Sequence, residues 1–229
     1  MTGTLINTAT ILLGGTIGLF FGARLPQRAR ETVVAGLGLF TAAIGIQMFF
    51  KSEHAIPVLL SLLIGGLLGE WWRIESRLEH LGAWLEARFT PSDDDGSLFV
   101  KGFLTASLLF CVGPMTILGS IQDGLTGDYS LLAIKAVLDG FAALAFASTL
   151  GVGVLFSVLV VLTYQGGISL AAAQMQSVMT PEMMNALTAA GGVVLLGLAI
   201  SSLLEIKPIR SGNLLPALLI APILVLLFK

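Results

Sequence analysis

Lys135 and Asp139 lie four residues apart in the apolar stretch KAVLDGFAALAFAS, where they could bind a proton or a cation. Residues four apart share one face of a helix. Charges at membrane depth are costly unless they are paired or hydrated, so they tend to mark an internal cavity or an ion path. A structural reading is also open, in which Lys135 reaches the outer interface and neutralises Asp139.

The stretch GFLTASLLFCVGPMTILGSIQDGLTGD, residues 102–128, predicts a broken helix with polar groups behind the break. Gly113-Pro114 removes a helical hydrogen bond in mid-segment. In lipid, the freed backbone groups must be satisfied by protein, water or a ligand, and transporters build solute sites at such breaks. The candidate binding residues here are Gly113, Thr116, Ser120, Gln122 and Asp123. Aspartate before glycine is also ordinary turn chemistry, which leaves the role of Asp123 open.

Uncharged polar residues in other apolar stretches extend this candidate substrate or ion site: Asn7, Tyr164, Gln165 and Asn213. Such groups orient a small solute or coordinate a cation through oxygen. In membranes, polar side chains also hold helices together.

Catalysis finds no support in the sequence. There is no nucleotide-binding loop, no serine, histidine and acid set, and no metal-ligand spacing around His54, His80 or Cys111. We therefore expect no enzyme, no catalytic residue, no metal and no cofactor. A net charge of −2 with scattered basic residues also gives no footprint for nucleic acid.

Composition predicts an all-α, polytopic membrane protein that resides in the lipid bilayer. Only 11% of the 229 residues are charged, and the mean hydropathy is +0.94. A water-soluble domain carries about 25% charged residues. The apolar stretches predict about eight spans, near residues 3–22, 31–50, 55–73, 99–121, 131–147, 151–173, 183–204 and 212–228.

A linker divides these spans into two parts. Residues 1–90 hold three spans and an amphipathic surface helix at 74–90, residues 91–97 form an acidic linker, and residues 98–229 hold five spans. Weak internal similarity pairs the first three spans with the next three. Repeats of three spans must be inverted in the membrane, as in secondary transporters and some channels. A competing alignment pairs the second and third spans with the last two.

Basic residues predict the orientation. Arg24, Arg28 and Arg30 follow the first span, and more basic residues follow the third, so these loops face the cytoplasm. Both termini are then outside. Gly14, Gly18 and Gly22 form a stripe at four-residue spacing that allows close helix packing, and such stripes also favour a homodimer.

Four stretches carry a resemblance to a known family: GTLINTATILLGGTIGLFFGARLP, the broken-helix stretch, KAVLDGFAALAFASTLGVGVLFS with YQGG, and LLEIKPIRSGNLLPALLIAP. With them the chain resembles the bacterial YqgA-like family, domain of unknown function 554, over nearly its whole length. The resemblance implies a multi-pass protein of the bacterial inner membrane and names no substrate.

These observations lead to one expected function and two alternatives. The expected function is a secondary transporter or facilitator for a small solute or cation. The alternatives are an ion channel on the same fold and a non-transporting scaffold or regulator whose partner docks on the surface helix.

Overall fold

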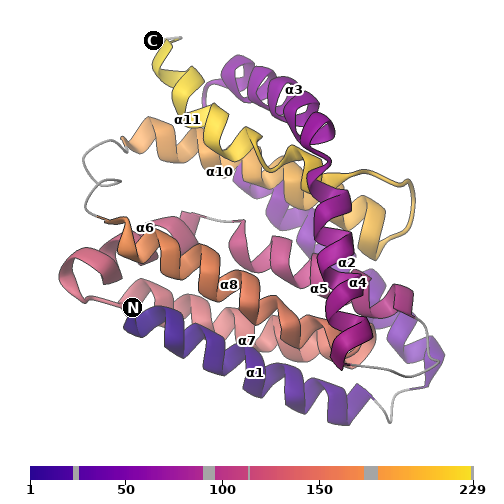
Figure 1. Cartoon of the computed structure of the whole chain (residues 1–229). Helices are drawn as coiled ribbons and strands as arrows, with labels where there is room; N and C mark the ends of the chain where they lie inside the picture. Colours follow the sequence, from indigo (N-terminus) through magenta and orange to yellow (C-terminus); the bar gives the residue numbers. More distant parts are fainter. Residues whose placement is uncertain (23–25, 90–95, 113, 173–179, 228–229) are drawn as a thin grey trace. The chain divides into compact units, whose positions relative to one another are not determined.

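Helices form all the elements of the computed structural model within the residues it describes, which are 1–22, 26–89, 96–112, 114–172 and 180–227 (Figure 1). The chain packs as two compact units that interleave along the sequence. The first unit comprises Met1–Val34, Glu79–Cys111 and Met115–Ser177, and the second comprises Ala35–Leu78, Val112–Pro114 and Val178–Lys229. These units differ in kind from the predicted parts, which follow one another on either side of residues 91–97. The predicted division stays a prediction.

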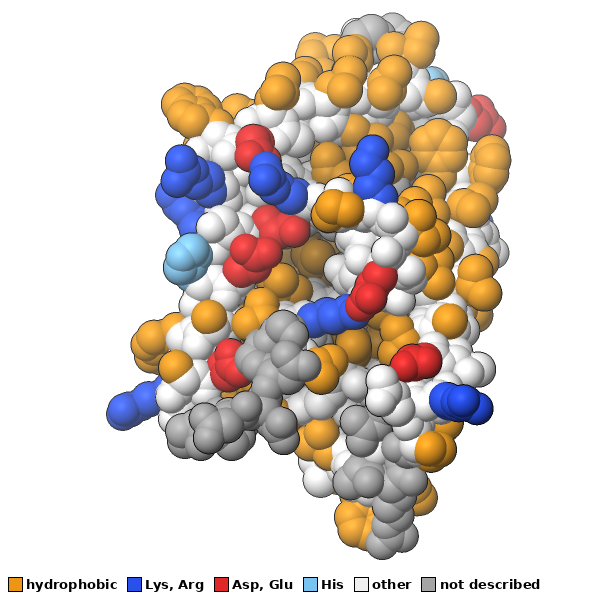
Figure 2. Space-filling view, turned by 90° about the vertical axis from the view of Figure 1, so that its right-hand side faces the viewer, with side chains coloured by type: hydrophobic (Ala, Val, Ile, Leu, Met, Phe, Trp, Pro, Cys, Tyr) orange, Lys and Arg blue, Asp and Glu red, His pale blue; other side chains and the backbone are white. Residues whose placement is uncertain are grey.

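Six helices are long and apolar enough to cross a membrane: α1 (Thr2–Gly22), α2 (Gln27–Phe49), α3 (Ala55–Trp72), α7 (Ser130–Leu150), α8 (Gly153–Leu170) and α10 (Pro181–Leu198), which continues as the π-helix η1 (Ala199–Leu203). Many large apolar side chains on these helices are exposed, among them Leu67 at 75% and Phe141 at 70%. Figure 2 shows such side chains spread over the face that it draws. A surface of this kind suits lipid, and the prediction of a polytopic helical bundle is confirmed.

The predicted break in the fourth apolar segment is confirmed. Helix α5 (Gly96–Cys111) ends shortly before α6 (Pro114–Thr126), and the two are bent by 62°. Proline is well placed at the first position of α6, because the amide it lacks would have no helical partner there. Across the break, the Thr116 hydroxyl donates to the Phe110 carbonyl at 3.1 Å. Gly113 itself lies outside the described residues.

The last apolar segment is not one long helix. It comprises the 3₁₀ turn η2 (Ser211–Leu214) and α11 (Ala217–Leu227), which has 11 residues. A helix that crosses a bilayer needs about 20 residues. The structure therefore gives six spans, or seven if the bent pair counts as one, and the full count of eight and the inverted repeats stay predictions.

Glycines bring α1 and α7 into backbone contact in the first unit. A Cβ atom on Gly14, Gly18 or Gly22 would overlap the carbonyl oxygen of Gly140, Leu144 or Ser148, respectively. Both sets of positions increase by four residues and in the same order, so the two helices run parallel (Figure 1). The close packing predicted for this stripe is confirmed.

Helix α4 (Ile74–Phe89) occupies the predicted amphipathic segment. In its part within the first unit, Leu85 packs with Phe99 and Phe103. Trp84 is 61% exposed. Helix α5 begins at Gly96, inside the range predicted for the linker, most of which lies outside the described residues.

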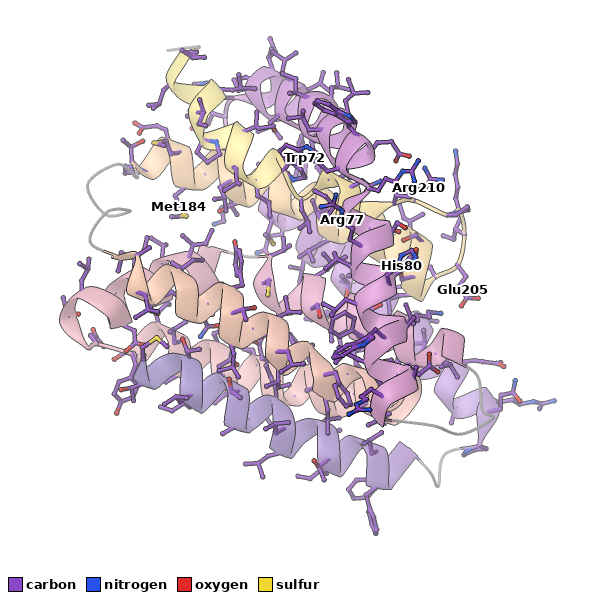
Figure 3. The ribbon with its side chains drawn as sticks, viewed as in Figure 1. Trp72, Arg77, His80, Met184, Glu205 and Arg210 are labelled. Carbon is purple, nitrogen blue, oxygen red and sulfur yellow. The ribbon has the colours of Figure 1, made fainter. Side chains whose placement is uncertain are left out.

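In the second unit, polar side chains fasten the turn η2 to the connection between α3 and α4. Glu70 accepts from Arg210 and from Asn213, each at 2.7 Å, and Glu75 accepts from the Gly212 amide at 2.8 Å. Figure 3 labels Arg210 after α10 and Trp72 at the end of α3. Gly69 lacks a side chain that would overlap the Asn213 backbone, so α3 and η2 can approach closely enough for these bonds.

Candidate functional site

Helix α7 carries the buried ion pair at the centre of the candidate site. The ammonium of Lys135 contacts Oδ2 of Asp139, one helical turn further on. Only 6% of Lys135 and 9% of Asp139 is exposed. Both residues therefore lie inside the first unit and do not face its surface, as expected for charged groups that would be costly in lipid.

Amide side chains from two other helices complete the surroundings of the pair. Asn7 of α1 donates through Nδ2 to Oδ2 of Asp139 at 3.0 Å and to Oε1 of Gln165 at 3.1 Å. Gln165, on α8, is fully buried, as is Asn7. Because Nδ2 faces two oxygens, the hydrogen-bond network sets the orientation of the Asn7 amide. Its own oxygen, Oδ1, then has no partner among the described residues.

Thr4 extends this network toward the N-terminal end of α1. Its hydroxyl accepts from Nε2 of Gln165 at 3.2 Å, and the residue is fully buried. Thr4 and Asn7 are three residues apart and so share one face of α1. That face of α1 thus bonds Gln165 of α8 through both residues and Asp139 of α7 through Asn7.

Asp123 occupies a neighbouring position, at the first turn of α1. Its Oδ2 accepts from the Gly3 amide at 3.0 Å and pairs with the amino group of Met1 at 3.0 Å. A carboxylate satisfies free amides at a helix N-terminus and is favoured there by the helix dipole. The structure thus gives Asp123 a capping role on α1 and no direct bond to Lys135 or Asp139.

The remaining predicted site residues have other surroundings. Ser120 is fully buried, and its hydroxyl has no partner within the part of the chain that the structure describes. Tyr164 is half-buried on α8. Asn213 belongs to the second unit, where its oxygen also accepts from the Glu75 amide at 2.8 Å. The binding roles predicted for these residues stay predictions.

Gln122 is exposed and donates to Asp128 at 2.7 Å in the turn between α6 and α7. Asp128 also accepts from the Ser130 hydroxyl at 2.6 Å and from the Ser130 amide at 3.0 Å. These bonds from Ser130 lower the pKa of Asp128 below its ordinary value, because they favour the charged carboxylate. The aspartate is thereby fixed as a turn residue.

Chemically, the arrangement holds one carboxylate among several donors. The ammonium of Lys135 and the amide of Asn7 both point at the same oxygen of Asp139. The pair is neutral as a whole, and any ligand that neutralises Asp139 would release Lys135 and Asn7 to another partner. A site of this kind can replace the contact between Lys135 and Asp139 by contacts of each residue with a ligand.

Sequence reasoning missed two buried polar residues beside the predicted ones. Thr4 bonds Gln165, and Ser169 is 5% exposed with a hydroxyl that lacks a partner among the described residues. Helical spacing offered a signal, since Ser169 follows Gln165 by four residues and Thr4 precedes Asn7 by three. The signal is weak because membrane hydroxyls usually bond their own helix backbone, as Thr163 does here.

Comparisons with known proteins agree on one family. The family described as "Protein of unknown function (DUF554)" matches residues 2–226. The chain is 34% identical to "Uncharacterized membrane protein YdfK" of Bacillus subtilis, covering 98% of this chain and 96% of the relative. It is also 34% identical to "Uncharacterized protein YqgA" of Escherichia coli, covering 96% and 94%. No solved structure matches the chain.

Proposed function

This chain belongs to the membrane-protein family of domain of unknown function 554, and we propose that it is a secondary transporter or facilitator for a small solute or cation. The resemblance of the whole chain to YdfK, which is named as a membrane protein, supports a location in a membrane and says nothing of transport. The proposed location is the bacterial inner membrane, with both termini outside. On this proposal the protein is not an enzyme.

The observation that carries the proposal is the buried ion pair with its two amide partners. Lys135, Asp139, Asn7 and Gln165 come from three helices and form one hydrogen-bonded group. Removing two charges from water has a large desolvation cost, so well-packed apolar residues in the same place would often stabilise the fold as much or more. Stability alone therefore does not explain this ion pair. A group that must be charged for transport would be retained despite that cost.

The broken span adds a second supporting feature. The end of α6 reaches the same end of the first unit as the start of α1, through the bond between Asp123 and Gly3. Discontinuous helices beside a buried charge are typical of transporter sites. We propose that binding at Asp139 releases Lys135 and that this exchange of partners is transmitted to α1 and α8 through Asn7 and Gln165.

Flux measurements in proteoliposomes test this proposal. Purified protein is reconstituted, and the uptake of sodium, potassium and small organic anions is measured with and without a pH gradient. We expect wild-type protein to move at least one of these solutes and Asp139→Asn to abolish the flux. Glu53→Gln, which neutralises an exposed carboxylate, is the matched control and should retain it.

The alternatives predict different results. Unitary currents in planar bilayers, at rates beyond those of a carrier, would indicate a channel on the same fold. Folded wild-type protein that moves none of these solutes and carries no current would contradict transport and favour a scaffold. In that case substitutions on exposed residues of α4, such as Trp84, should remove the biological activity while Asp139→Asn does not.

A further inference from the structure

Six buried polar atoms in the first unit have no hydrogen-bond partner among the described residues. Two of them, Thr105 Oγ1 and Ser107 Oγ, belong to α5, and the other four are Asn7 Oδ1, Ser120 Oγ, Asp123 Oδ1 and Ser169 Oγ on α1, α6 and α8. None of the four residues is more than 5% exposed. Buried polar atoms in proteins are nearly always bonded, and where protein partners are missing an internal water commonly takes their place. Unpartnered buried atoms of this kind therefore indicate bound water or a ligand.

Contacts between helices bring the residues that carry these atoms together. Asp123, at the end of α6, bonds the Gly3 amide of α1. One residue further along α6, a Cβ atom on Gly124 would overlap the Ser169 carbonyl oxygen of α8. Ser120 precedes Gly124 by one helical turn and so lies on the same face of α6. Three of the four atoms thus belong to one junction of α1, α6 and α8.

Asn7, which carries the fourth atom, connects this junction to the ion pair through its amide nitrogen. Thr4 directly follows Gly3 in α1 and bonds Gln165 of α8. Gln165 bonds Asn7, and Asn7 bonds Asp139. A continuous row of buried polar groups therefore leads from Asp123, beside the exposed turn that follows α6, to Asp139 in α7.

We propose that a file of water molecules, held by Ser120, Asp123, Ser169 and Asn7, carries protons from the turn after α6 to Asp139. The inference rests on the proposed function for the role of Asp139, and it deepens that function by naming the proton as the coupling ion. The mobile carriers are the waters, because side-chain amides hold a file in place without relaying protons.

At Asp139 itself, an inorganic cation fits less well than a proton. Asn7 presents its nitrogen to Asp139, whereas sodium or potassium requires oxygen ligands. The Lys135 ammonium and the Asn7 nitrogen already contact Oδ2 of Asp139, so a metal ion would find few oxygen ligands there. A proton needs only one oxygen lone pair of Asp139 and no coordination shell.

The proton step changes the charge of the pair. A hydronium ion at the Asn7 end of the file gives one proton to a carboxylate oxygen of Asp139, which forms an O–H bond and leaves a water molecule behind. Lys135 keeps its own proton and loses its anionic partner, so the pair changes from neutral to singly positive. The Lys135 ammonium and the Asn7 amide are then free to hold an anionic solute.

Other titratable groups around Asp139 are few. Cys111 of α5 is buried, and Tyr164 of α8 is half-buried. Helix α1 has no titratable side chain, and α6 contributes Asp123. Asp139 is thus the acceptor that the file reaches, and Lys135 is the cation beside it.

Thiol accessibility tests whether the file contains water. In a Cys111→Ala background, Ser120→Cys and Ser169→Cys are made one at a time in the full chain. Membranes are treated with silver nitrate, since silver is a small soft cation that binds thiolates and travels only through water. The remaining thiols are then counted with a maleimide after denaturation.

Ser157→Cys is the matched control. Ser157 is buried on α8, as is Ser169, but its hydroxyl donates to the Val154 carbonyl at 2.6 Å. We expect silver to remove the maleimide-reactive thiol at residues 120 and 169 and to leave the thiol at residue 157. Protection of all three thiols in folded protein, verified by size-exclusion chromatography, would overturn the water file.

Proton flux tests the use of the file. Proteoliposomes that contain a pH-sensitive dye are given a membrane potential with potassium and valinomycin, and the internal pH is followed. We expect Asp123→Asn and Asp139→Asn each to abolish the flux that wild-type protein and Ser157→Ala show. Flux that survives Asp123→Asn but not Asp139→Asn would overturn the route while leaving the proposed function intact. Silver access without proton flux in wild-type protein would overturn the proton role itself.

Discussion

Asn7 is the residue that joins the candidate site into one unit. Its single amide nitrogen donates to a carboxylate on α7 and to an amide on α8, while its backbone belongs to α1. Loss of this side chain would leave Asp139 with Lys135 as its remaining bonded partner within the described part of the chain, and would free Oε1 of Gln165. The geometry of the ion pair therefore depends on a neutral residue more than 130 positions away.

A double-mutant cycle at residues 135 and 139 tests whether the two charges stabilise each other. We expect Lys135→Met to destabilise the protein by about 3–5 kcal/mol at neutral pH, because it leaves a buried carboxylate without its cation. Asp139→Asn should also destabilise it, and the double variant should be more stable than Lys135→Met alone. The measurement is the free energy of unfolding in mixed micelles. Additive effects would contradict the coupling.

At the scale of residues, the sequence predicted the ion pair but not its partners. The spacing of Lys135 and Asp139 is local information, because helical geometry alone puts residues four apart together. The bonds to Asn7 and Gln165 depend on how α1, α7 and α8 pack, which no local pattern determines. Both amides could be proposed as candidates because polar groups are rare in such apolar stretches, yet their pairing required the structure.

Among the elements, α1 and α7 pack so closely beside the site that no side chain fits between their backbones at the glycine stripe. Their backbones touch at Gly14, Gly18 and Gly22 of α1, so the helices cannot separate without losing the whole contact. Such close approach brings Asn7 to Asp139 without long side chains between them. The glycines therefore position the polar residues as well as packing the helices.

Gly18→Leu should disrupt this packing. Any side chain at this position overlaps the Leu144 backbone, and overpacking of a well-packed interior typically costs about 1–3 kcal/mol or more. We expect a lower yield of folded protein and a lower unfolding temperature, measured by fluorescence-detected size-exclusion chromatography after heating. The control is Gly36→Leu on α2, where a Cβ atom would have no neighbour within 4 Å. Equal effects of the two substitutions would contradict the role of the stripe.

Prediction of elements succeeded where a single residue type decides the backbone. The break before α6 follows from proline chemistry, and the structure places it where expected. The last apolar segment is as hydrophobic as a span but divides into η2 and a short α11. Polar bonds from Glu70 and Glu75 hold that turn, and these partners come from a segment about 140 residues earlier.

For the whole molecule, the parallel course of α1 and α7 limits how the chain crosses the membrane. Two parallel helices start on the same side, so an odd number of crossings must lie between them. If α2 and α3 each cross once, the bent pair of α5 and α6 must cross as well. This reasoning favours a full crossing over a re-entrant loop and agrees with the orientation predicted from the basic residues.

Cysteine labelling in intact cells tests this layout. In a Cys111→Ala background, we expect Thr2→Cys and Tyr129→Cys to react with a membrane-impermeant maleimide, because both would lie at the outer ends of α1 and α7. Arg28→Cys, at the start of α2, should react only after the membrane is permeabilised. Labelling of residues 2 and 129 from opposite sides would contradict a full crossing by the bent pair.

The separation of Asn7 from Asp139 also has a consequence during synthesis. Ribosomes add about 5–20 residues per second, so Asp139 emerges roughly 7 to 26 s after Asn7. Throughout that interval α1 has neither the backbone that its glycines contact nor an acceptor for its buried amide. The nascent chain must therefore keep α1 in the membrane without its final neighbours until α7 and α8 have been inserted, which makes the candidate site one of the last parts of the first unit to assemble.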